Sequence, residues 1–431
     1  MFWPSAVDHN PPSTFMLICN VANTMLSAEA ARAKVVEIVS QAAPSPNTET
    51  VDLAANPALV LGRVIAEHIV ADRDYPPFDR SIRDGFAVHS VETSQPGTCL
   101  RIVGESRAGV PFDGTVGRHE CVRIFTGAAL PPGTDAVIMQ EYARVENDCV
   151  TFEQPAQPGL NYVHAGKEAP AGEIVVPRGS RLGFSELAMA AQVGYTQIVV
   201  ARKPRIAILT TGDEIVDVNE TPGPYEIRNS NSSTLAALVT LAGGKPVICG
   251  NAPDNIAELR KHIEHGLKED ALVLSGGVSV GEYDFVESVL KDLGAEFFFD
   301  SVALRPGKPT VFGWCQGTPV FGLPGNPVST MITFQLFVQP AIELMSGIPA
   351  RPIAYFKAKL ATPVRERGAI THFIPARVTY TDGDPVVEPV RWEGSADIGA
   401  IVRGNCYLVV RPDRLELSPG SWVDILPRPG W

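Results

Sequence analysis

The sequence predicts a protein of several domains, in which an α/β domain with an open, mostly parallel sheet is flanked by β-rich domains. Between about residues 205 and 348, apolar runs typical of buried strands alternate with segments of helical periodicity. Residues 72–172 carry short β-rich runs with many glycines and prolines, and alternating patterns return after residue 353. A chain of 431 residues is also long for a single core.

The first part of the chain is predicted to contain a tail and one long helix. Residues 1–25 are expected to be a disordered tail, or to reflect a start codon assigned too early. Ser27 is placed to cap a helix over Ala28–Ala42. We assign residues 26–71 and 173–203 to an N-terminal helix and linker domain, which the β-rich insertion at 72–172 interrupts.

The α/β domain is placed at residues 204–348, and residues 349–431 are expected to form a small β-barrel. Inside the α/β domain, apolar strands end in loops rich in polar residues and glycine, at Arg205–Glu214, Pro246–Asp254, Leu274–Asp284 and Thr318–Val328. Helical patterns follow at Ser233–Leu241, Asn255–Leu267 and Phe285–Leu293. In an open parallel sheet, ligands bind beyond the carboxyl ends of the strands, so the site is expected at these loops.

The loop at Leu274–Asp284 is the most informative of the four. Its glycines and serines lie between an apolar strand and a helix, where backbone N–H groups can converge on an anion. The segment Gly277–Gly281 also matches the nucleophile elbow of hydrolases, with Ser279 as nucleophile. His372 is the only histidine downstream and lies in another predicted domain, so the hydrolase alternative is disfavoured.

The composition restricts the classes of partner. The net charge of −12 argues against nonspecific nucleic-acid binding, so a bound anion needs local cations or a metal. No apolar run approaches the ~20 residues of a membrane span, so no membrane partner is expected. The seven cysteines are dispersed, odd in number and without CxxC spacing, which predicts a reduced, cytoplasmic protein without a disulfide framework. His262 and His265 share a predicted helix face but are interpreted as surface residues.

Six ordered motifs together resemble the molybdopterin molybdenumtransferase family, which includes the gephyrin E-domain. They are SIRDGFAV, IFTGAALPPGTDAV, TTGDEI, SGGVSVGEYD, RPGKP and GLPGNPVS, and the resemblance covers nearly the whole chain from about residue 28. It implies a molybdopterin-binding α/β domain, a β-rich insertion and a C-terminal β-barrel. It also implies a homodimer whose site is shared between subunits, with molybdopterin adenylyltransferase as the upstream partner.

The reaction that this resemblance implies is the insertion of molybdate into adenylylated molybdopterin with release of AMP, assisted by Mg²⁺. Carried over position by position, the implied catalytic residues are Asp84, Thr126, Glu168, Glu214, Asp254 and Asp284, of which Glu214, Asp254 and Asp284 would hold the metal. The implied pterin and phosphate ligands are Thr211, Gly212, Ser275, Gly276, Gly277, Ser279 and Asn326. The implied molybdate ligands are Arg305, Lys308, Arg377 and Ser395.

Several positions depart from the family pattern, and two other functions compete. Ser301 replaces a frequent lysine, Glu168 replaces the usual aspartate, and Ser395 matches only loosely. Pro375 lies where an arginine is expected, with Arg377 two residues on. One rival is a non-catalytic pterin- or nucleotide-binding scaffold of the same fold, against which the matched acidic residues argue. The other is the adenylyltransferase that makes the substrate, which the length of this chain disfavours because that enzyme lacks the insertion and the barrel.

Overall fold

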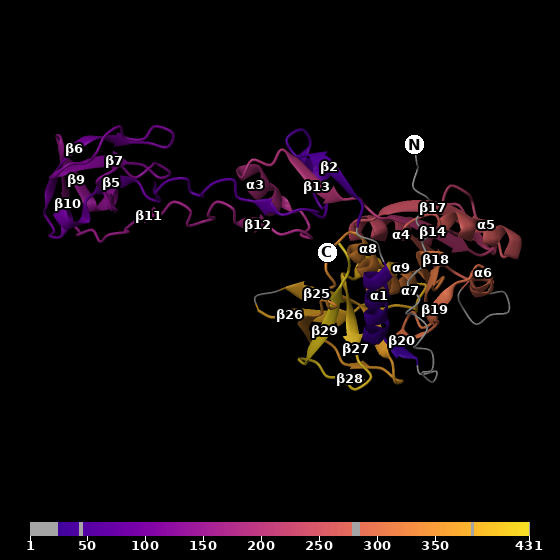
Figure 1. The fold of residues 1–431 in the computed structure, drawn as a ribbon. Helices are drawn as coiled ribbons and strands as arrows, with labels where there is room; N and C mark the ends of the chain where they lie inside the picture. The colour runs from indigo at the N-terminus through magenta and orange to yellow at the C-terminus, as the bar shows by residue number, and fades with distance from the viewer. Residues whose placement is uncertain (1–24, 43–45, 278–284, 381–382, 431) are drawn as a thin grey trace, which may run out of the picture. The chain divides into compact units, whose positions relative to one another are not determined.

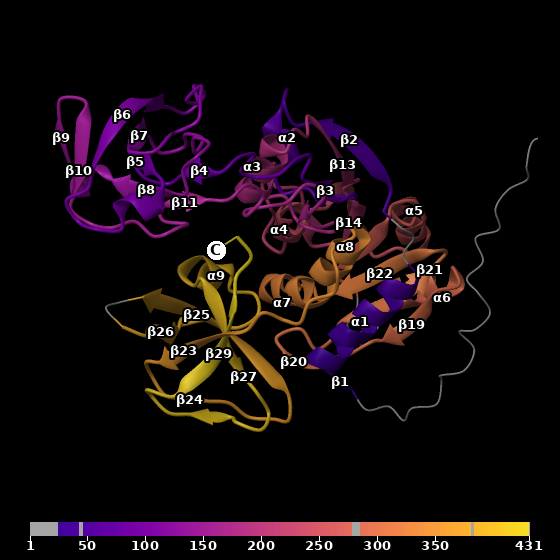
Figure 2. The same cartoon turned by 60° about the vertical axis from the view of Figure 1, so that its left-hand side comes forward.

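The computed structural model of the chain describes residues 25–42, 46–277, 285–380 and 383–430 (Figures 1 and 2). The described chain divides into two compact units. The first comprises the residues up to 49, residues 62–64 and residues 200–431, and the second comprises residues 50–61 and 65–199.

The first unit contains the predicted α/β sheet, which has six strands. In spatial order these are β17 (Lys245–Ala252), β14 (Arg205–Thr211), β18 (Ala271–Ser275), β22 (Thr318–Leu323), β21 (Val311–Cys315) and β19 (Glu296–Phe299). The first four run parallel, and β21 and β19 extend one edge in antiparallel pairings. The prediction of a mostly parallel sheet is confirmed, and the carboxyl ends of four strands meet at one edge.

Helices cover both faces of this sheet because side chains alternate along its strands. On β14, Ile206 and Ile208 belong to one hydrophobic cluster, whereas Ala207 and Leu209 belong to the other. The first cluster includes residues of α1 (Ala28–Ala42), α4 (Ser230–Ala242), α7 (Pro327–Thr333) and α8 (Gln339–Met345). The second includes residues of α5 (Ile256–Gly266) and α6 (Val286–Asp292).

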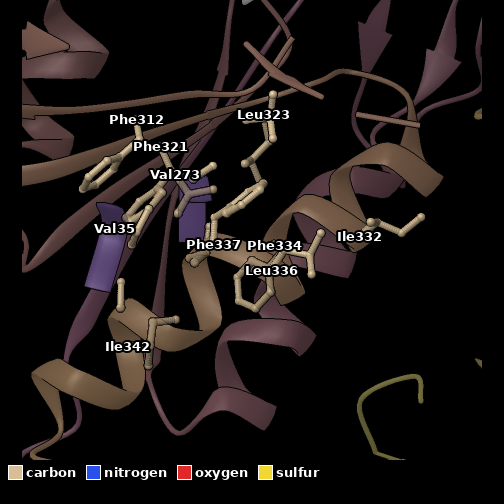
Figure 3. Packing of buried hydrophobic residues seen from close by; sticks show 14 of the residues in the cluster. Val35, Val273, Phe312, Phe321, Leu323, Ile332, Phe334, Leu336, Phe337 and Ile342 are labelled. Atoms are coloured by element: carbon tan, nitrogen blue, oxygen red, sulfur yellow. The ribbon is translucent and has the colours of Figure 1, made fainter. Parts of the chain in front are cut away.

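The first cluster is the larger of the two cores (Figure 3). Phe312 of β21 and Phe321 of β22 stack there with ring centroids 5.0 Å apart, and Val35 of α1 and Ile342 of α8 pack against the same layer. The Ser27 Oγ accepts a hydrogen bond from the Ala30 N–H at 3.1 Å, so the predicted cap of this helix is confirmed. The helix therefore starts where the sequence indicated and is fixed by burial of one apolar face.

Residues 327–345 form an almost continuous helical stretch, in which a π-helical segment, Phe334–Val338, joins α7 to α8. This stretch is long and apolar enough to cross a membrane by length and composition, but 67% of its most apolar window is buried inside the fold. Its apolarity is explained by packing against the sheet and α1, which is the environment of a core helix.

The C-terminal part of the first unit is a closed five-stranded barrel, as predicted. Its strands, in order around the barrel, are β25 (Thr371–Tyr380), β26 (Pro385–Pro389), β23 (Phe356–Leu360), β29 (Trp422–Pro427) and β27 (Cys406–Val410), and β27 pairs again with β25. Two strands from elsewhere extend this sheet: β20 (Val302–Arg305) pairs with β25, and β1 (Leu26–Ser27) pairs with β20. A short helix, α9 (Ile398–Arg403), and the two-stranded sheet of β24 (Val364–Arg365) and β28 (Glu416–Leu417) complete the domain.

The second unit contains the β-rich insertion. Its six-stranded sheet has the order β8 (Ala136–Met139), β5 (Gly85–Val88), β7 (Glu120–Ile124), β6 (Cys99–Ser106), β10 (Cys149–Phe152) and β9 (Ala143–Glu146). Small two-stranded sheets pair β4 (Arg80–Ser81) with β11 (Tyr162–Val163), β3 (Ile69–Val70) with β12 (Ile174–Val176), and β2 (Thr48–Asp52) with β13 (Gln197–Ala201). Its helices are α2 (Pro57–Val60), α3 (Phe184–Gln192) and the 3₁₀ turns Ser90–Thr93 and Gln140–Tyr142.

One prediction about the cysteines is wrong, because Cys99 and Cys149 form a disulfide. The antiparallel pairing of β6 with β10 places Cys149 opposite Arg101 and Cys99 opposite Thr151, so the two cysteines are diagonal neighbours with Cα atoms 6.2 Å apart. Their separation of 50 residues hides this proximity from any local spacing rule.

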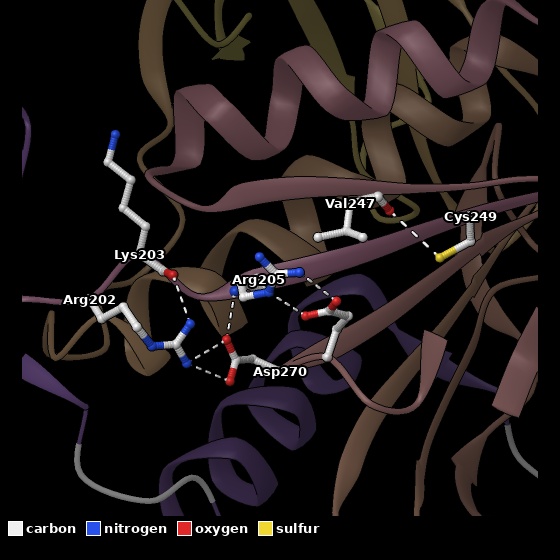
Figure 4. Close-up of polar contacts among 7 residues, drawn as sticks. Arg202, Lys203, Arg205, Val247, Cys249 and Asp270 are labelled. Carbon is white, nitrogen blue, oxygen red and sulfur yellow. Dashed lines mark hydrogen bonds and ion pairs between the residues drawn. The ribbon is translucent and has the colours of Figure 1, made fainter. Parts of the chain in front are cut away.

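Ion pairs fix the amino-terminal ends of the central strands (Figure 4). Arg202 donates to both carboxylate oxygens of Asp270 at 2.9 Å, and the Arg205 guanidinium donates to Glu269 at 2.6 and 2.7 Å. The Arg205 backbone N–H also donates to Asp270 at 2.6 Å. These bidentate contacts tie the start of β14 to the turn that precedes β18, at the end of the sheet opposite the carboxyl ends.

Candidate functional site

A cavity of about 700 Å³ opens at the carboxyl ends of the parallel strands, where the sequence predicted the site. We call it the sheet cavity. Its lining includes the predicted residues Thr211, Gly212, Glu214, Asp254, Ser275, Gly276, Gly277 and Asn326. Ser279 and Asp284 lie outside the described residues, so their placement is not assigned.

Glycine is required where β18 runs into the sheet cavity. Gly276 and Gly277 both have positive φ, at +95° and +64°. A Cβ atom at Gly276 would lie 2.7 Å from the Thr211 carbonyl oxygen, and one at Gly277 would lie 2.8 Å from the Thr211 Oγ1. The loop therefore presents bare backbone beside the end of β14. The Thr211 hydroxyl is buried and has no hydrogen-bond partner among the described residues.

Two asparagines of the sheet cavity escaped the sequence analysis. Asn231 of α4 donates to Ser275 Oγ at 2.8 Å and to the Gly325 carbonyl oxygen at 2.7 Å, joining the loops that follow β18 and β22. Asn229 caps α4 through its contact with the Ser232 N–H at 2.9 Å. The run Asn229-Ser-Asn231 before a helix is typical of a helix cap and could have been recognised in the sequence. The hydrogen bonds of Asn231 to two distant segments are visible only in the fold.

The acidic edge of the sheet cavity is formed by Glu214 and Asp254, with Asp213 beside them. The Asp254 N–H donates to Asp213 Oδ1 at 3.0 Å. Partial burial raises the pKa of the Asp254 carboxyl, and the charges of Asp213 and Glu214 raise this pKa further. Within the described ranges, no three or more His, Cys, Asp or Glu residues form a cluster that could hold a metal by themselves.

A second cavity, of about 680 Å³, lies between the α/β domain and the barrel. We call it the barrel cavity. Its lining brings together Arg305, Lys308 and Ser395, and it shares Asn326 with the sheet cavity. Asn326 occupies the predicted N-cap position of α7, but its side chain makes no capping hydrogen bond. Arg305 and Lys308 are exposed, and Glu366 and Glu393 line the same cavity.

Arg377 is not among the residues that line the barrel cavity. It lies on β25 opposite Glu388 of β26 and is exposed. The structure therefore brings Arg305 and Lys308 together in one cavity and leaves the third predicted cation, Arg377, outside it. His262 and His265 do not form a site: the His262 Nδ1 lies 2.9 Å from the Cys249 carbonyl oxygen, and His265 is exposed.

The other predicted catalytic residues lie in the second unit. Asp84 Oδ1 accepts hydrogen bonds from the Thr126 N–H at 2.7 Å and from the Thr126 Oγ1 at 2.8 Å. Both bonds lower the pKa of the Asp84 carboxyl, and the bond from the backbone N–H has the larger effect. Glu168 forms an ion pair with Arg80 at 2.7 Å. Asp84, Thr126 and Glu168 are all exposed within their unit, so they are accessible to a ligand.

Three family profiles match successive parts of the chain. Residues 26–194 match the MoeA N-terminal region (domain I and II), residues 207–344 match a probable molybdopterin binding domain, and residues 357–427 match the MoeA C-terminal region (domain IV). These matches cover most of the chain in the order that the motifs indicated.

Curated proteins and solved structures agree with these profiles. A protein of Haemophilus influenzae named molybdopterin molybdenumtransferase is 35% identical over 412 residues, which cover 94% of this chain and 98% of that protein. One of the same name from Staphylococcus aureus is 33% identical, over 85% of this chain and 88% of that protein. The structure of a molybdopterin biosynthesis moeA protein from Pyrococcus horikoshii is 31% identical, with a TM-score of 0.72, and covers 95% of this chain and all of that chain.

Proposed function

Because this chain belongs to the molybdopterin molybdenumtransferase family, we propose that it inserts molybdate into adenylylated molybdopterin and releases AMP, which completes molybdenum cofactor. It is an enzyme of molybdenum cofactor biosynthesis, and nothing favours the non-catalytic scaffold. The observation that carries the detailed proposal is the pair of cavities that share Asn326, one with carboxylates and bare glycine backbone, the other with the exposed cations Arg305 and Lys308.

The sheet cavity is proposed to hold the pterin phosphate and the adenylate. The exposed backbone of Gly276 and Gly277 and the unpartnered hydroxyl of Thr211 suit anionic oxygens, which need N–H and O–H donors. Ser275 is oriented by the Asn231 amide, so its position is fixed before a ligand arrives. The pterin itself would reach past Asn326 toward the barrel cavity.

The barrel cavity is proposed to hold molybdate. This substrate is a tetrahedral dianion, and a guanidinium can donate two parallel hydrogen bonds to such an oxyanion. Arg305 and Lys308 are exposed, so their charged groups are accessible to such an anion. Ser395 adds a hydroxyl to the same lining. Arg377 is left outside this proposal because it does not line the cavity.

A divalent cation, most simply Mg²⁺, is proposed to assist. The residues fit this ion in one respect: Mg²⁺ is commonly bound through one or two carboxylates together with substrate phosphates, and Glu214 and Asp254 are available at the cavity edge. The pKa of the Asp254 carboxyl is raised first by partial burial and then by the like charges of Asp213 and Glu214, which a cation would neutralise. When bound, the ion would neutralise charge on the phosphate oxygens, while Glu214 and Asp254 hold it and Asp213 orients Asp254.

Further parts of the proposal concern assembly and location. Asp84, Thr126 and Glu168 are proposed to act on the same substrate in a homodimer whose site is shared between subunits. We also propose that the enzyme is cytoplasmic and receives its substrate from molybdopterin adenylyltransferase, without nucleic-acid or membrane partners. Sedimentation of the purified protein tests the dimer, and complementation between inactive Asp84→Ala and Glu214→Ala chains tests the sharing of the site.

The central experiment measures AMP release from adenylylated molybdopterin. Release should require both molybdate and a divalent cation, and omission of either should reduce it to the background of buffer alone. Omitting molybdate while supplying sulfate is the matched control, because sulfate is also a tetrahedral dianion. Pterin binding without AMP release under complete conditions would overturn the enzymatic proposal and revive the scaffold.

A further inference from the structure

Arg228 is a cation in the wall of the sheet cavity that the proposed function leaves without a role. It lies on β16 (Ile227–Arg228), is exposed and lines this cavity. Among the described residues of the lining, which include the carboxylates of Glu214 and Asp254, it is the only lysine or arginine. The segment 278–284, outside the described residues, contains neither lysine nor arginine in its sequence. Arg228 is therefore the one cationic side chain that these residues offer to a phosphate.

The backbone of Arg228 is held beside the acidic edge of the cavity. β16 pairs in parallel with β15 (Ile215–Val216), which places Arg228 opposite Val216. The Ile227 N–H donates to the Glu214 carbonyl oxygen at 2.8 Å, so the strand is tied to the residue that carries one of the carboxylates. Arg228 is also the last residue before the cap of α4, whose first turn contributes to the same lining.

The side chain of Arg228 is anchored at one nitrogen. Its Nε donates to the Glu220 carbonyl oxygen at 3.0 Å. That carbonyl belongs to a turn in which the Glu220 N–H donates to the Asp217 carbonyl oxygen at 3.0 Å, and the Glu220 carboxylate accepts from the Asp217 N–H at 3.2 Å. A guanidinium has five N–H donors, so four remain on its two terminal nitrogens beyond this bond. Two of them are parallel and match two oxygens of a phosphate.

The position of Arg228 selects one half of the proposed substrate. Asn326 belongs to both cavities, so the pterin, which is proposed to reach from the sheet cavity toward the barrel cavity, passes there. Arg228 lines the sheet cavity and not the barrel cavity, and the apolar side chains of Ile215 and Ile227 share its lining. A cation beside apolar surface suits a phosphate attached to an aromatic base, because the base buries apolar area while the phosphate pairs with the guanidinium.

We propose that Arg228 is a binding residue for the phosphate of the adenylate in the sheet cavity. The inference rests on the proposed function for the identity of this nucleotide. Arg228 would supply a full positive charge, which the backbone N–H groups of Gly276 and Gly277 do not carry. If Arg228 served only to hold the loop 217–226 through the Glu220 carbonyl, its replacement would change the stability of that loop without a specific effect on phosphate binding.

Calorimetric titration with AMP and with adenosine tests the inference without turnover. Arg228→Gln removes the charge, and AMP should then bind about tenfold more weakly. This is the low end for a charge-assisted hydrogen bond, because the guanidinium is exposed to water. Adenosine has no phosphate, so its affinity should be the same for the wild type and the variant. Arg228→Lys keeps the charge but loses the planar fork, and its affinity for AMP should lie between the two.

Arg414→Gln is the matched control. Arg414 is also exposed and also donates to a backbone carbonyl, that of Trp422 at 3.2 Å, but it lines neither cavity. Its replacement should leave the affinity for AMP unchanged. Equal affinity of the wild type and Arg228→Gln for AMP would overturn the inference, and so would absence of AMP binding to the wild type. An equal loss of AMP and adenosine binding in Arg228→Gln would assign Arg228 a structural role instead.

Kinetics separate this inference from the proposed function. In Arg228→Gln the concentration of adenylylated molybdopterin for half-maximal AMP release should rise by about tenfold, whereas the molybdate requirement should not change. A rise in the molybdate requirement alone would contradict the assignment to the adenylate. If the wild type releases no AMP from the substrate but still binds AMP through Arg228, the proposed function fails while the assignment of the phosphate site stands.

Discussion

The sheet cavity and the barrel cavity are neighbours of nearly equal volume, about 700 and 680 Å³, but their linings differ in charge. The sheet cavity has glycine backbone, hydroxyls and the carboxylates of Glu214 and Asp254. The barrel cavity has the cations Arg305 and Lys308 beside Glu366 and Glu393, with a buried histidine behind them. The contact between them is Asn326, a neutral side chain that belongs to both linings.

In the proposed function, a chain of net charge −12 would bind two anionic substrates at these two linings. A dianion placed beside Glu214 and Asp254 would be repelled, so the acidic edge suits an anion only when a cation is bound as well. We propose that Arg305 and Lys308 bind the second anion directly in the barrel cavity. Each part of this proposal can be tested by substitution.

The largest effect is expected from Asp254→Asn. Removing a carboxylate from the proposed metal edge should lower turnover by about a hundred- to a thousandfold, the usual loss for one preorganised electrostatic group. AMP release at saturating substrate measures it. Glu264→Gln, an exposed carboxylate of α5 outside both cavities, is the control and should leave the rate unchanged.

The same variant should slightly raise the melting temperature at pH 7. The pKa of Asp254 is raised in the folded protein, so its stabilising contribution is present at low pH and is lost as pH rises through that pKa. The difference between Asp254→Asn and the wild type should therefore be largest at neutral pH and vanish in acid. A lower melting temperature at pH 7 would contradict the assigned like-charge repulsion.

Arg305→Ala should weaken the binding of molybdate in the barrel cavity. Loss of a charge-assisted bond of ~1.5–3 kcal/mol should raise the molybdate concentration for half-maximal rate by about ten- to a hundredfold. Pterin affinity should change far less. Arg377→Ala removes the same side chain from the same sheet but outside the cavity, and it should have no effect. If the two variants titrate alike with molybdate, the barrel cavity is not the oxyanion site.

Asn231→Ala tests whether the hydrogen bonds of Asn231 hold the sheet cavity in shape before a ligand binds. Without the amide, the Gly325 carbonyl and Ser275 hydroxyl each lose a partner, which should cost about 1–3 kcal/mol of unfolding free energy. For the larger unit this corresponds to a fall in melting temperature of several degrees. Calorimetry measures it, with Ser232→Ala, on the same helix, as the control. Arg305→Ala, by contrast, should leave the melting temperature unchanged because the Arg305 side chain is exposed.

Ser395→Ala should have the smallest effect. The hydroxyl lines the barrel cavity but carries no charge, so the molybdate requirement should rise by about two- to tenfold. Molybdate titration of AMP release checks this, beside Ser301→Ala, whose residue does not line the cavity. An effect of Ser395→Ala greater than that of Arg305→Ala would reverse the order of importance proposed for this cavity.

Local and periodic features were predictable from the sequence. The cap at Ser27, the four parallel strands and the helices that follow them were read correctly because each depends on residues close in sequence. The family motifs also identified the residues that line the sheet cavity. Eight of the predicted positions, Asn326 among them, line this cavity, because the carboxyl ends of parallel strands converge at one edge of the sheet.

The features that could not be predicted from the sequence depend on contacts between distant segments. The Cys99–Cys149 pair arises from the register of β6 and β10, and the bridge made by Asn231 arises from two loops that are far from it in sequence. The exclusion of Arg377 from the barrel cavity follows from its position on β25, two residues beyond Pro375.

The strand β20 leaves the α/β domain and joins the barrel sheet between β1 and β25. Because hydrogen-bonded strands do not slide past one another without breaking their ladder, this pairing fixes the spacing of the two cavities. The distance between the two cavities is therefore expected to be set by the fold. Under the proposed function, a substrate that occupies both cavities must be long enough to reach from Gly276 to Arg305, whereas a shorter pterin would occupy one cavity only. Competition by pterins of different lengths would test this expectation.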